Sequence, residues 1–217
     1  MMYDVVVVGG GHAGCEAASS AAKMGSSVLL VTMNLQTIAQ MSCNPAMGGV
    51  AKGQILREID ALGGLSGIIT DNTAIQFRML NRSKGPAMWS PRVQSDRMRF
   101  AEQWRLALEQ IVNLDFLQAS VEGLDVTNNK VSGVFLSNGN RISCKTVVLT
   151  SGTFLNGVMH IGENKTHGGR SSESSSKGIT KCLELLGFES GRMKTGTPPR
   201  LDGRSLNYSA FEEQKGD

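Results

Sequence analysis

The sequence predicts an α/β fold in which a parallel sheet with helices is followed by an antiparallel β-meander. Three observations lead to this prediction: an apolar strand at residues 4–8, the motif G-x-G-x-x-G directly after it, and a two-residue hydrophobic period between residues 121 and 144. The 217 residues are enough to bury a core. Gly accounts for 26 of them, grouped between apolar runs, as is typical of tight turns that face a ligand.

The first predicted unit is a β-α-β segment. Residues 4–8 are apolar on both faces, as in a buried parallel strand. A helix rich in Ala is expected from Ala13 to Met24, ended by Gly25, and a second strand is expected from Ser27 to Val31. A glycine motif indicates nucleotide binding when it lies within a β-α-β unit of this kind, about 30 residues long.

The glycine motif lies between the first strand and the helix. Gly9, Gly11 and Gly14 would let backbone N–H groups approach a pyrophosphate at the helix N-terminus, so the motif predicts dinucleotide binding. The acidic residue that usually binds the ribose about twenty positions further on is absent. Either Thr32 or Asn34 serves instead, or the ribose is held differently.

The middle of the chain predicts two helices and two long loops. Residues 32–53 show little periodicity, and a loop of that length usually has a function. Helices are expected over 54–62 and 94–111, with a second loop over 81–91 between them. The expected core faces are Ile55, Ile59 and Leu62 in the first helix and Met98, Ala101, Trp104, Leu108 and Ile111 in the second.

The second half of the chain is predicted to begin with strands. One strand is expected over 114–119, and three antiparallel strands over 121–144 with turns at Asn128-Asn129 and Asn138-Gly139. A last buried strand is expected over 146–150. This order of elements is the Rossmann-like layout of FAD-binding domains in flavoproteins that bind two dinucleotides, an analogy at the level of the fold.

The predicted domain boundary follows the last buried strand. Gly152 would bring the backbone close to the cofactor again, unless it is an ordinary glycine at a strand end. We assign residues 1–154 to the FAD-binding domain and residues 155–217, with a short helix at about 178–186, to a connecting segment.

Composition excludes several classes of protein. The apolar runs are far shorter than the roughly 20 residues of a membrane-spanning helix, and no basic region precedes the first strand, as it would in a signal peptide. The four cysteines form no C-x-x-C pair and the three histidines have no zinc-site spacing, so we expect neither a disulfide framework nor a metal. These features predict a soluble, cytoplasmic protein without a membrane partner.

Five separated motifs occur along the whole chain. They are Val-Val-Gly-Gly-Gly-His-Ala-Gly-Cys-Glu-Ala-Ala (7–18), Met-Ser-Cys-Asn-Pro-Ala-Met-Gly-Gly (41–49), Lys-Gly-Pro-Ala (84–87) with Arg92, Gln94, Asp96 and Arg97, Gly-Gly-Arg (168–170) and Lys-Thr-Gly-Thr-Pro-Pro-Arg (194–200). Together they resemble the MnmG family, also called GidA, which are flavoproteins that modify wobble uridines of tRNA. Family members are much longer, so the resemblance implies that this chain corresponds to an N-terminal portion that leads into the NADH-binding region.

The resemblance implies an enzyme that adds a carboxymethylaminomethyl or aminomethyl group to carbon 5 of the wobble uridine. FAD is reduced by NADH, methylene-tetrahydrofolate supplies one carbon, and the GTPase MnmE is the partner, in a heterotetramer built on a homodimer. The flavin performs the redox chemistry, and the protein positions the base. The chain alone is expected to be inactive. The expected cofactor-binding residues are Gly9, Gly10, Gly11, His12, Ala13, Gly14, Thr32, Val121, Thr150, Gly152 and Ser176.

Other functions remain open at this point. The folate- and FAD-dependent tRNA uracil methyltransferase is a close relative, although Ser-Cys-Asn-Pro-Ala and Lys-Gly-Pro-Ala favour MnmG. A general FAD oxidoreductase such as a disulfide reductase would place a second cysteine near Cys15, and none lies within five residues. A non-catalytic module is the third alternative.

Cys43 is the candidate catalytic residue. It lies in a loop rich in Gly, Pro and Asn after the second strand, at the carboxyl end of a parallel sheet, where ligands bind. A thiolate there would help to activate carbon 5 of uracil, whereas the alternative is a small residue that packs the loop. Cys15, Cys144 and Cys182 are expected in the core.

Basic residues are concentrated between residues 78 and 105, where seven bases and two acids give 7 − 2 = +5, against +3 for the whole chain. Contact with tRNA phosphates is one interpretation, and a solvated helix face or neutralisation of the cofactor pyrophosphate by Arg97 and its neighbours are the others. Trp89 is available for stacking, and Trp104 is expected in the core. The candidate nucleic-acid contacts are Arg78, Arg82, Lys84, Arg92, Lys194 and Arg200.

Overall fold

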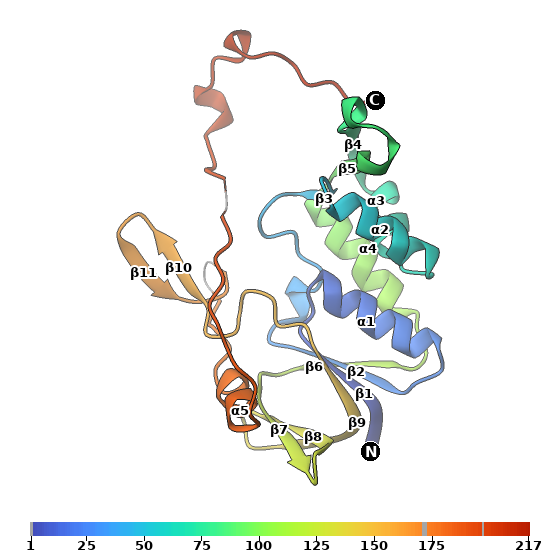
Figure 1. The fold of residues 1–217 in the computed structure, drawn as a ribbon, viewed down its shortest axis with the longest axis vertical. Coiled ribbons are helices and arrows are strands. Elements are labelled where there is room, and N and C mark those ends of the chain that lie inside the picture. The colour runs from blue at the N-terminus through green and yellow to red at the C-terminus, as the bar shows by residue number, and fades with distance from the viewer. Residues whose placement is uncertain (1, 171–172, 197) are drawn as a thin grey trace.

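The computed structural model describes residues 2–170, 173–196 and 198–217. Its centre is a six-stranded sheet in the order β6-β2-β1-β9-β8-β7 (Figure 1). The strands are β1 (Met2–Val8), β2 (Val28–Thr32), β6 (Leu114–Gln118), β7 (Val121–Thr127), β8 (Lys130–Leu136) and β9 (Arg141–Leu149). β6, β2, β1 and β9 are parallel, and β8 and β7 extend the sheet as antiparallel strands. The predicted α/β fold is confirmed.

One long strand joins the parallel part to the meander. β9 pairs with β8 through residues 141–143 and with β1 through residues 143–149. The third meander strand and the last buried strand, which the sequence suggested as two elements, are therefore one. No Gly, Pro or Asn interrupts this stretch, so nothing ends the strand at residue 144. The turn at Asn128-Asn129 lies where it was expected, with positive φ at both residues.

Two hydrophobic clusters pack on opposite faces of the sheet. Helices α1 (His12–Lys23) and α4 (Arg97–Glu109) cover one face, where Phe100 and Trp104 are fully buried (Figure 1). On the other face, α5 (Ile179–Leu185) packs against β7, and Ile179 is fully buried among residues of the meander. Residues beyond 154 thus contribute to the core of the sheet, and burial of this apolar surface stabilises their attachment.

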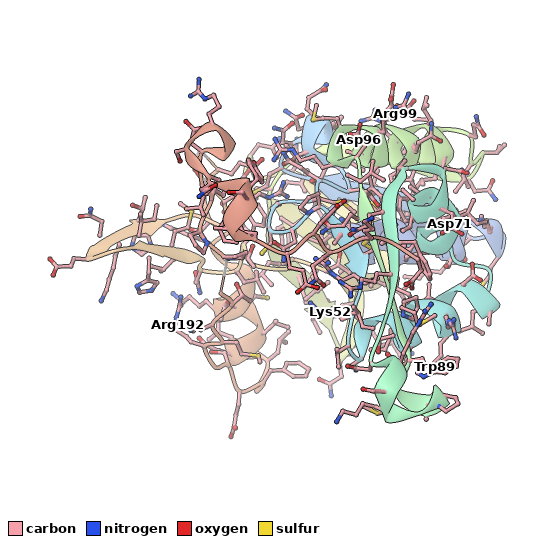
Figure 2. All side chains as sticks on the ribbon, turned by 90° about the horizontal axis from the view of Figure 1, so that it is seen from above. Lys52, Asp71, Trp89, Asp96, Arg99 and Arg192 are labelled. Carbon is pink, nitrogen blue, oxygen red and sulfur yellow. The ribbon has the colours of Figure 1, made fainter. Side chains whose placement is uncertain are left out.

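α4 begins three residues later than the periodicity suggested. Asp96 caps the helix, because its Oδ1 accepts hydrogen bonds from the backbone N–H groups of Met98 and Arg99 at 3.0 and 3.2 Å. Asp96 and Arg99 lie together at this end of the helix in Figure 2. Met98 is 71% exposed, so its assignment to the core was wrong; Phe100, which precedes Trp104 by one turn, takes that place.

A smaller antiparallel sheet lies beside the main one in the order β3-β5-β4. Its strands are β3 (Ala46–Gly48), β4 (Ala74–Leu80) and β5 (Ser90–Ser95), and the remaining elements of this region are η1 (Leu35–Thr37), α3 (Ser66–Asn72), η2 (Arg82–Lys84) and η3 (Pro86–Met88). The two segments that were expected to be loops thus contain short helices and strands. β3 has only three residues, too few for a two-residue period to be visible in the sequence.

Helix α2 (Lys52–Ala61) packs on the small sheet through glycine. A Cβ at Gly53 would lie 2.6 Å from the carbonyl oxygen of Pro91, so only glycine allows this approach. Ile55 and Leu62 are 55% and 89% exposed, and the apolar face predicted for this helix was therefore wrong. Helix α2 contacts the small sheet through its backbone at Gly53, and a pattern of apolar side chains cannot predict such a contact.

The C-terminal part forms a hairpin, helix α5 and an extended segment. The hairpin strands are β10 (Val158–Ile161) and β11 (Asn164–His167), and the extended segment contains η4 (Gly203–Ser205) and η5 (Tyr208–Ala210). The end of the chain returns to β4, where the N–H of Asp217 donates to the carbonyl of Phe77 at 2.9 Å (Figure 1). Among the described residues, no helix combines the length and the apolar character needed to cross a bilayer.

Candidate functional site

A cavity of about 700 Å³ opens at the carboxyl ends of β1, β2 and β9, which is where open parallel sheets bind ligands. This volume is in the range of cofactor sites. Most of the predicted cofactor-binding residues line it: Gly9, Gly10, Gly11, His12, Thr32, Val121, Thr150, Gly152 and Ser176. Two do not, since Ala13 faces outward and Gly14 packs inward. The structure thus brings together residues that are distant in sequence.

Three glycines of the loop from Gly9 to Gly14, called here the glycine loop, have different structural roles. Gly9 has φ +112°, which disfavours any residue with a side chain. A Cβ at Gly14 would lie 1.8 Å from the carbonyl oxygen of Gly9, so this glycine allows α1 to pack against the strand end. A Cβ at Gly11 would meet nothing within 4 Å and would project into the cavity. The loop therefore fits the backbone of a dinucleotide site.

The N-terminus of α1 opens onto the cavity. Its cap is Gly11, in an extended conformation, and no side chain among the described residues caps it. The first N–H groups of a helix lack partners within the helix and carry a partial positive charge. Because Gly11 and His12 line the cavity, this end of α1 can accept the pyrophosphate of a dinucleotide.

Thr150, at the end of β9, fixes the glycine loop from the other side. Its hydroxyl lies 3.0 Å from the carbonyl oxygens of both Val8 and Gly9, and its N–H donates to Val8 at 2.9 Å. The contact joins residues 142 positions apart in the sequence. Thr150 was predicted as a cofactor contact, and its position also explains how the loop keeps its shape.

His12 is held as a neutral imidazole. Burial lowers its pKa, and nearby Arg170 lowers it further, while a hydrogen bond to the carbonyl of Ala39 acts in the opposite direction. Since a carbonyl can only accept, Nε2 carries the proton, and the N···O distance is 3.2 Å. The edge of the ring contacts Phe100, with 5.4 Å between ring centroids.

Thr32 and Asn34 are the two candidates to bind the ribose in place of the missing acidic residue. Thr32 and Asn34 both line the cavity. Asn34 starts η1, and its Oδ1 already accepts a hydrogen bond from the N–H of Gln36 at 2.8 Å. Thr32 lies against Gly10, since a Cβ there would be 3.1 Å from the Thr32 hydroxyl. Thr32 thus lies against the glycine loop, whereas the side-chain oxygen of Asn34 is already engaged by the N–H of Gln36.

Cys43 is exposed and lines the same cavity. It belongs to residues 38–45, called here the Cys43 loop. The other cysteines differ from it: burial raises the pKa of Cys15 to about 12 and also raises that of Cys144, whereas Cys182 is partly buried against Leu124. Only thiolates react readily, so the two buried cysteines are inert.

Some charged side chains that line the cavity were not predicted as cofactor contacts. Arg170 lies over the ring of Phe154 at 5.1 Å and pairs with Glu173 at 3.3 Å, and all three line the cavity. Lys52, at the start of α2, lines it as well (Figure 2). The Gly-Gly-Arg motif was a signal for Arg170, but nothing in the sequence places α2 near the main sheet.

The candidate nucleic-acid contacts separate into four groups. Arg92 lines the cavity. Arg78 and Arg82 lie outside it and contact the end of the chain, where Arg82 pairs with Asp217 at 2.9 Å and Arg78 donates to Gln214. Lys84 and Lys194 are exposed outside the cavity lining, whereas Arg200 donates to the backbone carbonyls of Ser42 and Cys43.

The two tryptophans occupy the environments expected from the sequence. Trp104 is fully buried, and Trp89 is 40% exposed. Figure 2 shows Trp89 at the edge of the molecule, beside η2 and η3. Its indole N–H donates to the carbonyl of Arg82 at 3.2 Å. Within residues 2–170, 173–196 and 198–217, no group of His, Cys, Asp and Glu is arranged to hold a metal ion.

Residues 4–217 match the family model described as glucose inhibited division protein A, or GidA. The chain belongs to this family. The tRNA uridine 5-carboxymethylaminomethyl modification enzyme MnmG of Cytophaga hutchinsonii is 70% identical over 215 residues, and that of Porphyromonas gingivalis is 62% identical. The alignments cover 99% of this chain but only 35% and 34% of those proteins, so the chain spans about a third of their length.

Solved structures agree with the GidA family assignment. Aquifex aeolicus GidA superposes with a TM-score of 0.95 at 49% identity, over 100% of this chain and 36% of that one. A GidA-related protein from Thermus thermophilus gives a TM-score of 0.62 at 25% identity, over 86% and 69%. PqsL from Pseudomonas aeruginosa, described as a probable FAD-dependent monooxygenase, shares the fold alone, with a TM-score of 0.50 and 14% identity.

Proposed function

We propose that the chain is the FAD-binding part of an enzyme that adds a carboxymethylaminomethyl or aminomethyl group to carbon 5 of a tRNA wobble uridine. The observation that carries this proposal is that Cys43 lines the same cavity as the glycine loop, in a chain that belongs to the GidA family. A thiol and a dinucleotide site in one cavity fit an enzyme that combines a redox cofactor with activation of a base.

FAD is the dinucleotide that we assign to the cavity. The glycine loop and the start of α1 would bind its pyrophosphate, Thr32 its ribose, and Val121, Gly152 and Ser176 the rest of the cofactor. Bound FAD supplies the redox chemistry, with NADH as the reductant. We assign residues 1–154 to the FAD-binding domain and residues 155–217 to a segment that leads toward the NADH-binding region, although Ser176 lines the cavity from that second segment.

Cys43 is the residue that we assign to the reacting uridine. It is exposed in the cavity, so its thiol can reach a base that enters beside the cofactor. A thiolate that adds to carbon 6 of uracil makes carbon 5 nucleophilic, so that carbon 5 can bond to the methylene carbon of methylene-tetrahydrofolate. Carbon 5 then loses its proton, glycine or ammonia replaces the folate nitrogen on the methylene carbon, and release of the Cys43 thiolate restores the double bond between carbons 5 and 6. Arg92, in the same cavity, is suited to a phosphate or carboxylate of a substrate.

The remaining parts of the proposal concern the whole protein. The substrate is tRNA, the partner is the GTPase MnmE, and the assembly is a heterotetramer that contains a homodimer in the cytoplasm. Lys84 and Lys194 are exposed and suited to tRNA phosphates. The relatives that carry the MnmG name support the substrate, since their name specifies a tRNA uridine. A chain that spans a third of their length is not expected to modify tRNA by itself.

The first experiment is a visible absorption spectrum of the purified chain after incubation with FAD and removal of the excess. We expect a retained flavin band. Gly11→Val is the decisive variant, because its side chain would enter the cavity without contacting the protein, and we expect at least a tenfold loss of FAD affinity, or about 1.4 kcal/mol. A chain that retains no flavin, or a variant that binds as the wild type does, would contradict the assignment.

Gly191→Val is the matched control. A Cβ at Gly191 also meets nothing within 4 Å, but this residue does not line the main cavity. It carries the same change of side chain on an exposed segment. FAD affinity should stay at the wild-type value in this variant, and an equal loss in both variants would show that the effect does not arise at the glycine loop.

A further inference from the structure

Ala39, at the start of the Cys43 loop, has an unusual backbone conformation. Its φ is +54°, a region that costs a residue with a side chain about 1 kcal/mol. The residue is fully buried, its N–H donates to the carbonyl of Gly10 at 2.8 Å, and its carbonyl accepts from His12. Both partners belong to the glycine loop, so two hydrogen bonds hold the strained residue against the dinucleotide site.

The rest of the Cys43 loop is tied to other parts of the chain. Gln40 accepts a hydrogen bond from the guanidinium of Arg170. The carbonyls of Ser42 and Cys43 accept from Arg200 Nη2 at 3.1 and 3.2 Å. Arg200 is exposed and Arg170 is partly buried, and because both hydrogen-bond contacts lie at the surface they are weaker restraints than the buried contact at Ala39.

His12 is the residue best placed to control the loop. Its ring is oriented by Phe100, its pKa is lowered by burial, and its Nε2–H donates to Ala39. The ring therefore has one orientation and one tautomer, and a single N–H connects it to the Cys43 loop. The neighbouring Gly11 faces the cavity, so His12 lies between the cofactor site and the loop that carries the thiol.

We propose that His12 is a positioning residue: by donating its Nε2–H to Ala39 it sets the place of the Cys43 loop relative to the glycine loop, and thereby the reactivity of the Cys43 thiol in the cavity. The inference rests on the proposed function in treating Cys43 as the reacting thiol. It adds that the dinucleotide loop and the thiol loop are coupled through His12, so that a ligand on the first acts on the second.

The coupling is tested by the rate at which iodoacetamide alkylates Cys43, measured for each cysteine by mass spectrometry of its peptide. The chain is used without added cofactor. His12→Phe keeps a ring next to Phe100 but has no N–H to donate, and we expect the Cys43 rate to change by about fivefold, the factor that corresponds to one lost hydrogen bond. His12→Gln keeps a donor near the position of Nε2 and should restore a rate close to that of the wild type.

The other cysteines are internal controls in the same experiment. Cys182 is partly buried against Leu124 on the opposite side of the main sheet, and its rate should be the same in all variants. Cys15 is fully buried and reports unfolding, because it becomes reactive only when the core opens. If only the alkylation rate of Cys43 changes, the substitution has altered the position of the Cys43 loop. A general loss of stability would also raise the rate of Cys15.

Three outcomes would overturn the proposal. One is an unchanged Cys43 rate in a folded His12→Phe chain. If that variant exposes Cys15, the comparison of His12→Asn with His12→Gln decides, because the asparagine amide reaches only the position of Nδ1; equal Cys43 rates in the two would overturn it. Unfolding of all three variants would make His12 a residue of the core and would also overturn it.

The same experiment separates this proposal from the proposed function. No FAD, NADH or tRNA is present, so a chain that fails to bind FAD still reports the coupling. If FAD binds, its addition should change the Cys43 rate in the wild type, and His12→Phe should reduce that response to less than half. FAD binding without any effect on the Cys43 rate of the wild type would contradict the coupling and leave the cofactor assignment in place.

Discussion

The glycine loop and the Cys43 loop line the same cavity but are held in different ways. The glycine loop is built into the core: Gly14 packs against the carbonyl of Gly9, and Thr150 bonds to Val8 and Gly9 at the end of the strand that precedes the loop. The Cys43 loop is anchored at one end by the buried residues Ile38, Ala39 and Met41, whereas its exposed part, which carries Cys43, is held by hydrogen bonds from Arg200. The difference indicates that the cofactor side of the cavity is rigid, whereas the thiol side can be moved by the contacts that hold it.

The strongest test of the rigid side is Gly14→Val. The new Cβ would lie 1.8 Å from the carbonyl oxygen of Gly9, and neither atom can move without displacing β1 or α1. We expect a loss of more than about 3 kcal/mol of unfolding free energy, measured by urea denaturation. Gly11→Ala is the control, since its side chain has open space, and a similar loss there would show that Gly14 has no special role.

The second test uses the buried thiol one residue further along α1. The pKa of Cys15 is raised to about 12 in the folded chain from 9.0 in a model thiol, because burial disfavours the thiolate. The contribution to stability is therefore complete below pH 9 and decreases as the pH rises toward 12, by up to about 1.4 kcal/mol per pH unit.

The measurement is the urea midpoint between pH 8 and 11, compared in wild type and Cys15→Ala. The variant should show a smaller decrease over this window, because it has no thiol to ionise in the unfolded chain. Parallel curves for the two proteins would show that Cys15 does not contribute to the alkaline loss of stability. Both proteins share all other titrating groups, which cancel in the comparison.

A moderate effect is expected from Glu16→Ala, also in α1. The carboxylate of Glu16 accepts hydrogen bonds from the N–H groups of Leu65 and Ser66, at 3.0 and 2.6 Å, and thus caps α3 from a neighbouring helix. Loss of a cap costs about 1–2 kcal/mol in unfolding free energy. Glu16→Gln keeps an acceptor and should lose less; if thermal denaturation gives equal losses for both, the cap does not stabilise the fold.

The smallest effect is expected in the Cys43 loop itself. Ala39→Gly removes the strain at φ +54° but makes the unfolded chain more flexible, and the two effects, each about 0.5–1 kcal/mol, oppose one another. We expect the free energy of unfolding to change by less than about 0.5 kcal/mol. Ala39→Val, with a branched side chain in the same buried position, should be clearly destabilising, and a stable valine variant would argue against the observed backbone conformation.

Much of the cofactor side of the cavity, with the glycine loop, was predictable from the sequence, because its structure follows from residues close together in the chain. A strand, three glycines and an Ala-rich helix identify the glycine loop, and the Asn128-Asn129 turn identifies the meander. Thr150 was expected at the site because the parallel strand that precedes it must end there. These predictions needed no knowledge of contacts between distant parts of the chain.

The thiol side was less predictable, because it depends on distant contacts. The small sheet β3-β5-β4 was missed, since β3 has three residues and its partners lie more than forty positions away. Helix α2 approaches that sheet through Gly53, and Lys52 reaches the cavity by this packing alone. Arg200 was proposed for tRNA, yet it donates to the Cys43 loop, a role that no local pattern could reveal.

The contact between Thr150 and Val8 has a consequence for biosynthesis. It joins residues 142 positions apart, so a nascent chain holds the complete glycine motif long before the residue that fixes the motif's shape has emerged from the ribosome. Contacts of such long sequence separation form late and slowly. The nucleotide site is thus incomplete until Thr150 has been synthesised, and the first cofactor molecule must wait until β9 has inserted beside β1.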